Sequence, residues 1–210
     1  MICGLDEAGR GPLAGPVCAA AAILPEDFPL GLLADSKKMS AAARERSREA
    51  IVSGALAWGV GWASHAEIDE INILRASLLA MRRAFDCLFN PAFENGAWPS
   101  ALRDESPFGR ALSPAGGLQQ AEIKAVADGL YAPELPVPCA ALVKADSKVP
   151  QVMAASILAK TARDHVMEHY ALLYPGYGYE RHKGYPTQAH RKAALERGPS
   201  PIQRLSFRVR

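Results

Sequence analysis

The sequence predicts an α/β fold in which a mixed five-stranded sheet is flanked by helices and followed by a C-terminal helical segment. Three observations lead to this class. Two apolar stretches near the N-terminus flank a turn rich in glycine and proline, which is the pattern of two strands joined by a loop. Further along, apolar residues recur at spacings of three and four, which is typical of amphipathic helices. Segments of both kinds then alternate to the end of the chain, without an internal repeat.

The N-terminal part of the chain contains three expected strands and two expected helices. We expect strands over 2–5, 17–24 and 57–63 and a polar helix over 40–52. Ser64 and Glu67 have the spacing of a capping box, which places a helix N-terminus there. One long helix is expected to follow, because an apolar stripe runs from Ile71 to Leu88.

The C-terminal part is expected to add two more strands and two more helices. We expect strands over 123–127 and 139–143, helices over 150–173 and 186–196, and a loop over 174–185. Pro150 suits the first turn of its helix. Residues 89–121 contain four prolines and four glycines and show little periodicity, so we interpret them as a loop insertion.

Charge is distributed unevenly along the chain of 210 residues, whose formal net charge is only +2. Residues 181–210 carry eight lysine and arginine side chains against one acid, a net charge of +7. The rest of the chain carries 16 basic and 21 acidic side chains, a net charge of −5. This asymmetry predicts a polyanionic partner for the C-terminal segment. A basic face that is simply solvated explains the charge by itself equally well.

Several classes of protein are excluded. No apolar run reaches the roughly 18 residues of a transmembrane helix, so we expect no membrane span. The N-terminus lacks the basic and long apolar regions of a signal peptide. The four cysteines, Cys3, Cys18, Cys87 and Cys139, show no zinc-binding spacing. We therefore expect free thiols and a cytoplasmic protein that folds without disulfides.

Four carboxylates mark the ends of three expected strands. Asp6 and Glu7 end the first strand, and Asp128 and Asp146 each end one of the two later strands. On neighbouring strands these groups would form one acidic cluster, which must be protonated or neutralised by cations. Such oxygen ligands suit Mg²⁺ or Mn²⁺, and two such ions can activate water for phosphodiester hydrolysis. Alternatively, each acid is an ordinary strand-end or cap residue, with Asp146 capping the helix that follows.

The loop after the first strand also satisfies a different motif. Gly9, Gly11 and Ala14 have the spacing of a dinucleotide-binding loop, which would make the chain a nucleotide-binding domain. Pro16 interrupts the helix that such a loop must open, and the run that follows is strand-like. The acidic pair before the loop would also lie beside the pyrophosphate. Both points count against this alternative.

A series of motifs in fixed order resembles the ribonuclease HII family. The motifs are DEAGRGPLAGPV at 6–17, DSKK at 35–38, ADG at 127–129, KADS at 144–147, AASILAK followed by RD within 154–164, HKGYPT at 182–187 and RLSF at 204–207. They span nearly the whole chain. The resemblance implies the ribonuclease H fold, with a catalytic domain over 1–173 that includes the 89–121 insertion. A basic helical segment over 174–210 would complete the substrate groove.

The resemblance also implies an activity. The family hydrolyses the RNA strand of RNA–DNA hybrids endonucleolytically and incises 5′ of single ribonucleotides in duplex DNA, leaving 5′-phosphate and 3′-hydroxyl ends. The resemblance also implies that two Mg²⁺ or Mn²⁺ ions take part in catalysis. It further implies a role in removing ribonucleotides during replication and repair. The expected partner is an RNA–DNA hybrid or a DNA duplex that contains ribonucleotides. We expect a monomer, and the sequence leaves open whether replication or repair proteins also bind.

Residue roles follow from the same resemblance. Asp6, Glu7, Asp128 and Asp146 would be the catalytic, metal-binding carboxylates, and the substrate-binding residues would be Gly9, Arg10, Gly11, Ser36, Lys37, Lys183 and Tyr185. The backbone of residues 9–11 is expected to contact the ribose 2′-hydroxyl, which distinguishes RNA from DNA. Tyr185 would pack on the deoxyribose at the RNA–DNA junction. Ser36, Lys37 and Lys183 would hold phosphates, although both lysines could equally be solvated.

Three further interpretations remain. A type HIII ribonuclease H, which needs stretches of RNA and lacks the Gly-Arg-Gly loop, is the nearest alternative. Asp164 lies four residues after Lys160, so a structural ion pair is favoured over a fifth metal ligand. His182 lies alone in a polar loop, so we do not expect it to shuttle protons.

Overall fold

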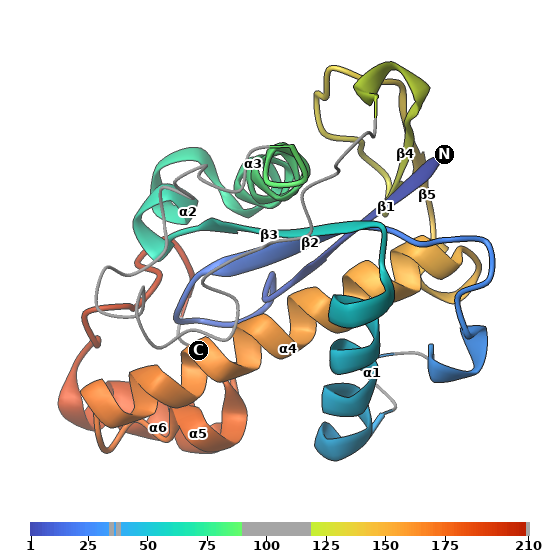
Figure 1. The fold of residues 1–210 in the computed structure, drawn as a ribbon. Helices are drawn as coiled ribbons and strands as arrows, with labels where there is room; N and C mark the ends of the chain where they lie inside the picture. Colours follow the sequence, from blue (N-terminus) through green and yellow to red (C-terminus); the bar gives the residue numbers. More distant parts are fainter. Residues whose placement is uncertain (34–35, 37–38, 90–118, 209–210) are drawn as a thin grey trace.

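The computed structural model describes residues 1–33, 36, 39–89 and 119–208. The described residues form a five-stranded sheet between two helical layers (Figure 1). The strands are β1 Ile2–Ala8, β2 Val17–Ile23, β3 Ala57–Ala63, β4 Lys124–Asp128 and β5 Cys139–Leu142, in the order β3-β2-β1-β4-β5. β2 is antiparallel to β1 and β3, whereas β4 is parallel to β1 and β5. The predicted mixed sheet is thus confirmed.

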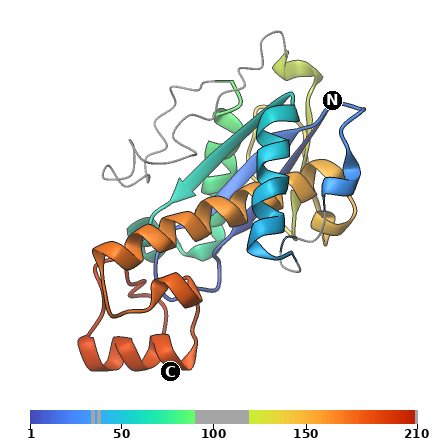
Figure 2. The ribbon, with the colours of Figure 1, turned by 60° about the horizontal axis from the view of Figure 1, so that its bottom comes forward.

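Helices cover both faces of this sheet. They are α1 Ala41–Gly54, α2 His65–Ile71, α3 Ile73–Asp86, α4 Pro150–Leu173, α5 Tyr179–His182 and α6 Gln188–Arg197, with short 3-10 turns η1 Leu30–Leu32, η3 Gln120–Glu122 and η4 Ala145–Ser147. The long helix α4 crosses one face with α1 beside it, and α2 and α3 cover the other face (Figure 1). The chain turns back after α4, so that α5 and α6 lie beside its C-terminal part (Figure 2).

The helix expected after Ser64 is broken in two, so this part of the prediction was wrong. Ser64 and Glu67 form the predicted capping box at the start of α2. At Asn72 the backbone takes a φ of 69°, which ends α2. The Asn72 side chain then accepts hydrogen bonds from the amides of Leu74 and Arg75 and so caps α3. Asparagine tolerates a positive φ and is also a favoured N-cap residue. The apolar periodicity continues across Asn72, so the pattern predicted one helix instead of two.

Two other segments, 174–185 and 89–121, were expected to be loops. The expected loop over 174–185 contains α5, a single helical turn entered through Gly178, whose φ is 79°. Most of the expected insertion, residues 90–118, lies outside the described residues. No helix in the part of the chain that the structure describes is long and apolar enough to cross a membrane.

Small residues in the central strands let the helices approach the sheet closely. Residues 19–22 of β2 are all buried alanines; Ala20 and Ala22 face α4, and the other two face α3. At Gly4 in β1, an added Cβ would lie 2.1 Å from the carbonyl carbon of Gln151 in the first turn of α4. The missing side chain at Gly4 therefore sets the distance between β1 and α4, which carries several residues of the site described below.

We expect Gly4→Ala to destabilise the fold by about 3 kcal/mol, because the new methyl group must push the backbone of α4 away from β1. Gly31→Ala is the matched control, since an added Cβ there meets nothing within 4 Å. Its effect should stay below about 0.5 kcal/mol. Urea unfolding followed by circular dichroism measures both, and equal midpoints would contradict the constraint at Gly4.

Candidate active site

A small polar cavity of about 200 Å³ opens where the C-terminal end of β1 meets α4. It is lined by Glu7, Ala8, Gly9, Arg10, Gly11, Ser36, Ser156, Lys160 and Tyr185. Most of these residues belong to the set predicted from the sequence. The cavity therefore brings together one predicted carboxylate, the Gly-Arg-Gly loop, Ser36 and Tyr185, which come from distant parts of the chain.

Asp6, Glu7 and Asp128 meet at this end of the sheet. The parallel register pairs Leu5 of β1 with Ala127 of β4, so the next residues, Asp6 and Asp128, lie level on adjacent strands and share a face. Asp6 is only 4% exposed, whereas Glu7 lines the cavity itself. We call these three carboxylates the acidic corner.

Burial and mutual repulsion raise the pKa of two carboxyls in the acidic corner. Burial raises the pKa of Asp6 well above its usual value, and the charges of Glu7 and Asp128 raise it further. Burial also raises the pKa of Glu7. The Arg10 guanidinium, 3.2 Å from Glu7 Oε1, opposes that shift, and Asp128 adds to it. Such an excess of buried negative charge is what a bound cation relieves.

The chemistry of the acidic corner fits a hard divalent cation, since carboxylate oxygens are the ligands that Mg²⁺ and Mn²⁺ prefer. Within the described ranges, however, no three His, Cys, Asp or Glu side chains are already arranged to hold a metal ion. The carboxylates instead have separate partners. Asp6 Oδ1 accepts from the Glu7 amide and Asp128 Oδ1 from the Ala145 amide, both at 2.7 Å, while Glu7 pairs with Arg10.

Asp146 does not end a strand, contrary to the prediction. β5 ends at Leu142, and Asp146 lies further along in the turn η4. Nor does Asp146 take the alternative role of helix cap, because the N-cap of α4 is Val149. The hydrogen bond from the Ala145 amide to Asp128 ties η4, and with it Asp146, to the acidic corner.

Ser156 and Lys160, one turn apart on α4, line the cavity but were not predicted as site residues. Ser156 Oγ lies 2.9 Å from Ser36 Oγ, and a hydrogen bond from Ser156 lowers the pKa of Asp6 against the effect of burial. Lys160 Nζ donates to Asp164 Oδ1 at 2.7 Å, the ion pair expected from their spacing. The sequence pattern that could have identified both residues is a pair of polar side chains at i and i+4 on a helix whose other residues are mostly buried.

Tyr185 forms one wall of the cavity and is 39% exposed, so its ring is accessible to a ligand. An added Cβ at Gly11 would lie 3.8 Å from its Cε1 atom. Two cationic groups, Arg163 Cζ and Lys160 Nζ, lie 5.8 and 5.9 Å from the ring centroid. These distances allow cation–π attraction, which favours one orientation of the ring.

His182 supports the Tyr185 segment. Its Nε2 donates to the Tyr177 carbonyl at 2.8 Å, its Nδ1 accepts from the Gly184 amide at 3.2 Å, and its ring stacks on His190 at 4.5 Å. His190 Nδ1 in turn donates to the Tyr185 carbonyl at 3.0 Å. Burial lowers the pKa of both histidines. These structural partners agree with the expectation that His182 is not a proton shuttle.

Lys183 does not line the cavity. Its Nζ donates to Glu168 Oε1 at 2.8 Å and to the Glu180 carbonyl at 2.6 Å.

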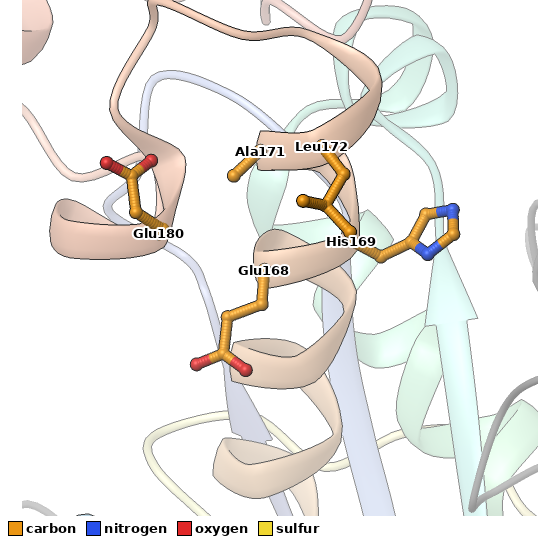
Figure 3. Close-up of a pocket in the computed structure, with 5 residues that line it drawn as sticks. All are labelled: Glu168, His169, Ala171, Leu172 and Glu180. Carbon is orange, nitrogen blue, oxygen red and sulfur yellow. The ribbon is translucent and has the colours of Figure 1, made fainter.

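A hollow of about 480 Å³ lies on that side of the molecule, lined by Glu168, His169, Ala171, Leu172 and Glu180. Its two glutamates point apart and its histidine points away from both (Figure 3). We therefore place the candidate active site in the cavity beside β1. Lys37 lies outside the described residues.

Comparisons with known proteins agree with each other. The family model described as Ribonuclease HII matches residues 3–88 and 124–210. A ribonuclease HII of Treponema denticola is 48% identical over 100% of this chain and 99% of its own. That relative therefore matches this chain from end to end.

Solved structures share the fold. The RNase HII of Archaeoglobus fulgidus, determined as a complex with PCNA, has a TM-score of 0.65 and 22% identity over 98% of this chain and 92% of its own. Bst-RNase HIII, determined in complex with Mn²⁺, has a TM-score of 0.64 and 19% identity over 99% of this chain and 67% of its own.

Asp6→Asn is expected to stabilise the protein in the absence of divalent cations. The pKa of Asp6 is higher in the folded state than in the unfolded state, so ionisation of Asp6 lowers the free energy of unfolding. This loss begins as the pH rises above the pKa of an aspartate in the unfolded chain, about 3.9. We expect a melting temperature at least about 3 °C above the original at pH 7.5 in EDTA, and a gain that declines towards pH 4. Asp27→Asn, at an exposed position, is the control and should change nothing. An Asp6→Asn protein that melts at or below the original temperature at pH 7.5 would contradict the repulsion.

Proposed function

The chain belongs to the ribonuclease HII family, which makes it a ribonuclease H that acts on RNA–DNA hybrids, and we propose that it cleaves them in the cavity at the end of β1. We also propose that it nicks duplex DNA on the 5′ side of single embedded ribonucleotides, leaving 5′-phosphate and 3′-hydroxyl ends. One observation carries this proposal: Glu7 of the acidic corner and the Gly-Arg-Gly loop line the same small cavity. We infer a role in removing ribonucleotides during replication and repair.

Asp6, Glu7, Asp128 and Asp146 would hold two divalent cations, Mg²⁺ or Mn²⁺. When bound, these ions would supply an activated water and neutralise charge on the leaving 3′ oxygen. The raised pKa of Asp6 and of Glu7 supports this assignment, because both carboxyls would be deprotonated more readily beside a cation. Ser156 would keep Asp6 in place through the hydrogen bond that it donates from α4.

Recognition of the ribose would fall to the other side of the cavity. The backbone of Gly9, Arg10 and Gly11 would contact the 2′-hydroxyl, and Tyr185 would pack on the neighbouring deoxyribose. Gly11 supports this arrangement, because the absence of a side chain there leaves the backbone open towards Tyr185. The presence of this loop favours a type HII over a type HIII activity, since the type HIII enzymes lack it.

The basic C-terminal segment, 174–210, would complete the groove that the catalytic part, 1–173, offers to the duplex. Arg204 is buried, and the Lys183 side chain is only 15% exposed and paired with Glu168, so neither is accessible to a phosphate in this conformation. Exposed basic residues remain at Arg181, Arg191, Lys192, Arg197 and Arg208. We propose that phosphates contact residues of this exposed set, and that Ser36 contacts a phosphate at the cavity. The PCNA complex of the archaeal relative supports a replication protein as a further partner.

Cleavage should require both a divalent cation and the acidic corner. On a labelled DNA duplex with one ribonucleotide, we expect a single nick 5′ of that residue with Mg²⁺ or Mn²⁺ and none in EDTA. Asp128→Asn should lower the rate by about 100-fold or more, because it removes a proposed cation ligand. Asp27→Asn is the matched control and should cleave at the original rate. Undiminished cleavage by Asp128→Asn, or cleavage in EDTA, would refute the proposal.

Gly11→Ala and Gly9→Ala should separate substrate recognition from folding. A methyl group at Gly11 meets only the Tyr185 ring, at 3.8 Å, so the fold should be kept while the methyl occupies space meant for the sugar. We expect kcat/KM on the one-ribonucleotide duplex to fall about tenfold or more. At Gly9, φ is 96° and an added Cβ would lie 1.9 Å from Arg163 Nε, so alanine should lower the melting temperature instead. Calorimetry and the nicking assay measure the two effects, and a Gly11→Ala protein of normal activity would contradict the assignment.

A further inference from the structure

Arg204 is completely buried, and its guanidinium is enclosed by the main chain of the glycine-rich loop. Its donors reach five carbonyl oxygens, those of Gly9, Arg10, Pro12, Gly15 and Pro16, at 2.6, 2.9, 2.8, 2.9 and 3.2 Å. All five partners are neutral oxygens, and burial lowers the pKa of Arg204 to about 9. Burying a charge in this way is unfavourable unless every donor is satisfied, which the loop achieves by folding around it.

The contacts of Arg204 also determine where the loop amides point. The described residues contain no cis peptide bond, and in a trans peptide the C=O of one residue and the N–H of the next point in opposite directions. Because the carbonyls of Gly9 and Arg10 point at Arg204, the N–H groups of Arg10 and Gly11 point away from it. The cavity lies on that opposite side, since Gly9, Arg10 and Gly11 line it and Arg204 does not.

Arg204 is itself held firmly. Asp69 of α2 accepts from the amides of Leu205 and Ser206 at 2.8 and 2.9 Å, which fastens this segment to the helical layer beside the sheet. The Arg204 amide donates to the Leu13 carbonyl at 2.9 Å, and its guanidinium lies 5.1 Å from the centroid of the Phe207 ring. The loop is thus oriented by a side chain that is fixed on several sides.

We propose that Arg204 is a positioning residue that aims the amides of Arg10 and Gly11 into the cavity, where both donate to the oxygen of the ribose 2′-hydroxyl. This inference rests on the proposed function of the cavity. Glycines allow a loop many backbone directions, so fixed carbonyls are needed to hold a pair of amides on one point. Donors that are oriented before the substrate arrives add to the discrimination between ribose and deoxyribose without reorganisation.

Arg204→Lys tests the proposal, because it keeps the charge but replaces a five-donor planar fork with three donors on one nitrogen. The assay compares kcat/KM on two duplexes that differ only at the embedded nucleotide, which carries a 2′-hydroxyl or a 2′-fluoro group. Fluorine is a poor acceptor, so the original protein should prefer the hydroxyl. In Arg204→Lys we expect the ratio of the two kcat/KM values to fall about fivefold.

Ile123→Val is the control for stability, because Ile123 is buried in the core. It precedes Lys124, which pairs with Ile2 at the start of β1, the end of that strand opposite to the loop. Partial unfolding lowers both rates together and leaves their ratio unchanged, so Ile123→Val should keep the original ratio. An unchanged ratio in folded Arg204→Lys would overturn the inference. If the original protein cleaves neither duplex, the proposed function fails instead.

A measurement on the original protein keeps the inference testable if Arg204→Lys does not fold. In NMR spectra recorded with Ca²⁺ in place of Mg²⁺, to suppress cleavage, the amide signals of Arg10 and Gly11 should shift on binding the one-ribonucleotide duplex. With the all-DNA duplex of the same sequence the shifts should be smaller. Equal shifts with both duplexes would overturn the assignment of these amides to the 2′-hydroxyl.

Discussion

Two buried arginines hold the glycine-rich loop between β1 and β2, and the site depends on them. Arg163 comes from α4 and donates to the carbonyls of Ala14 and Pro16, while Arg204 comes from the C-terminal segment and donates to five carbonyls of the same loop. Buried backbone carbonyls need partners, and an irregular loop cannot supply them from its own amides. The loop, α4 and the C-terminal segment are therefore mutually dependent, and the cavity requires all three.

The acidic corner works against this stabilisation. The parallel register of β1 and β4 places Asp6 and Asp128 level with each other, and burial makes their repulsion, and that of Glu7, costly. Such repulsion between buried groups is typical of a functional site, where groups needed for binding lower the stability of the fold. Glu7 and Arg10 connect the two features, because they form an ion pair at 3.2 Å on the edge of the cavity.

The charge of the C-terminal segment has more than one use. The uneven charge along the chain predicted a polyanionic partner. A net charge, however, does not distinguish buried or paired basic residues from exposed ones. The structure divides them: Arg204 organises a loop from inside the protein, and Lys183 is paired with Glu168. Exposed members such as Arg181 and Lys192 are the ones we propose for phosphate contacts, because only solvent-facing cations can meet a phosphate backbone.

Local features of this protein could be read from its sequence, because they depend on residues close together in the chain. The capping box at Ser64, the ends of α4 and the carboxylates at the ends of β1 and β4 all follow from periodicity and short motifs. The break at Asn72 is also local, but the apolar periodicity continued through it. The partners of Arg204 and Lys183 were decided only by tertiary structure. Arg204 meets Gly9 across a separation of 195 residues, and such a contact depends on packing that no local pattern records.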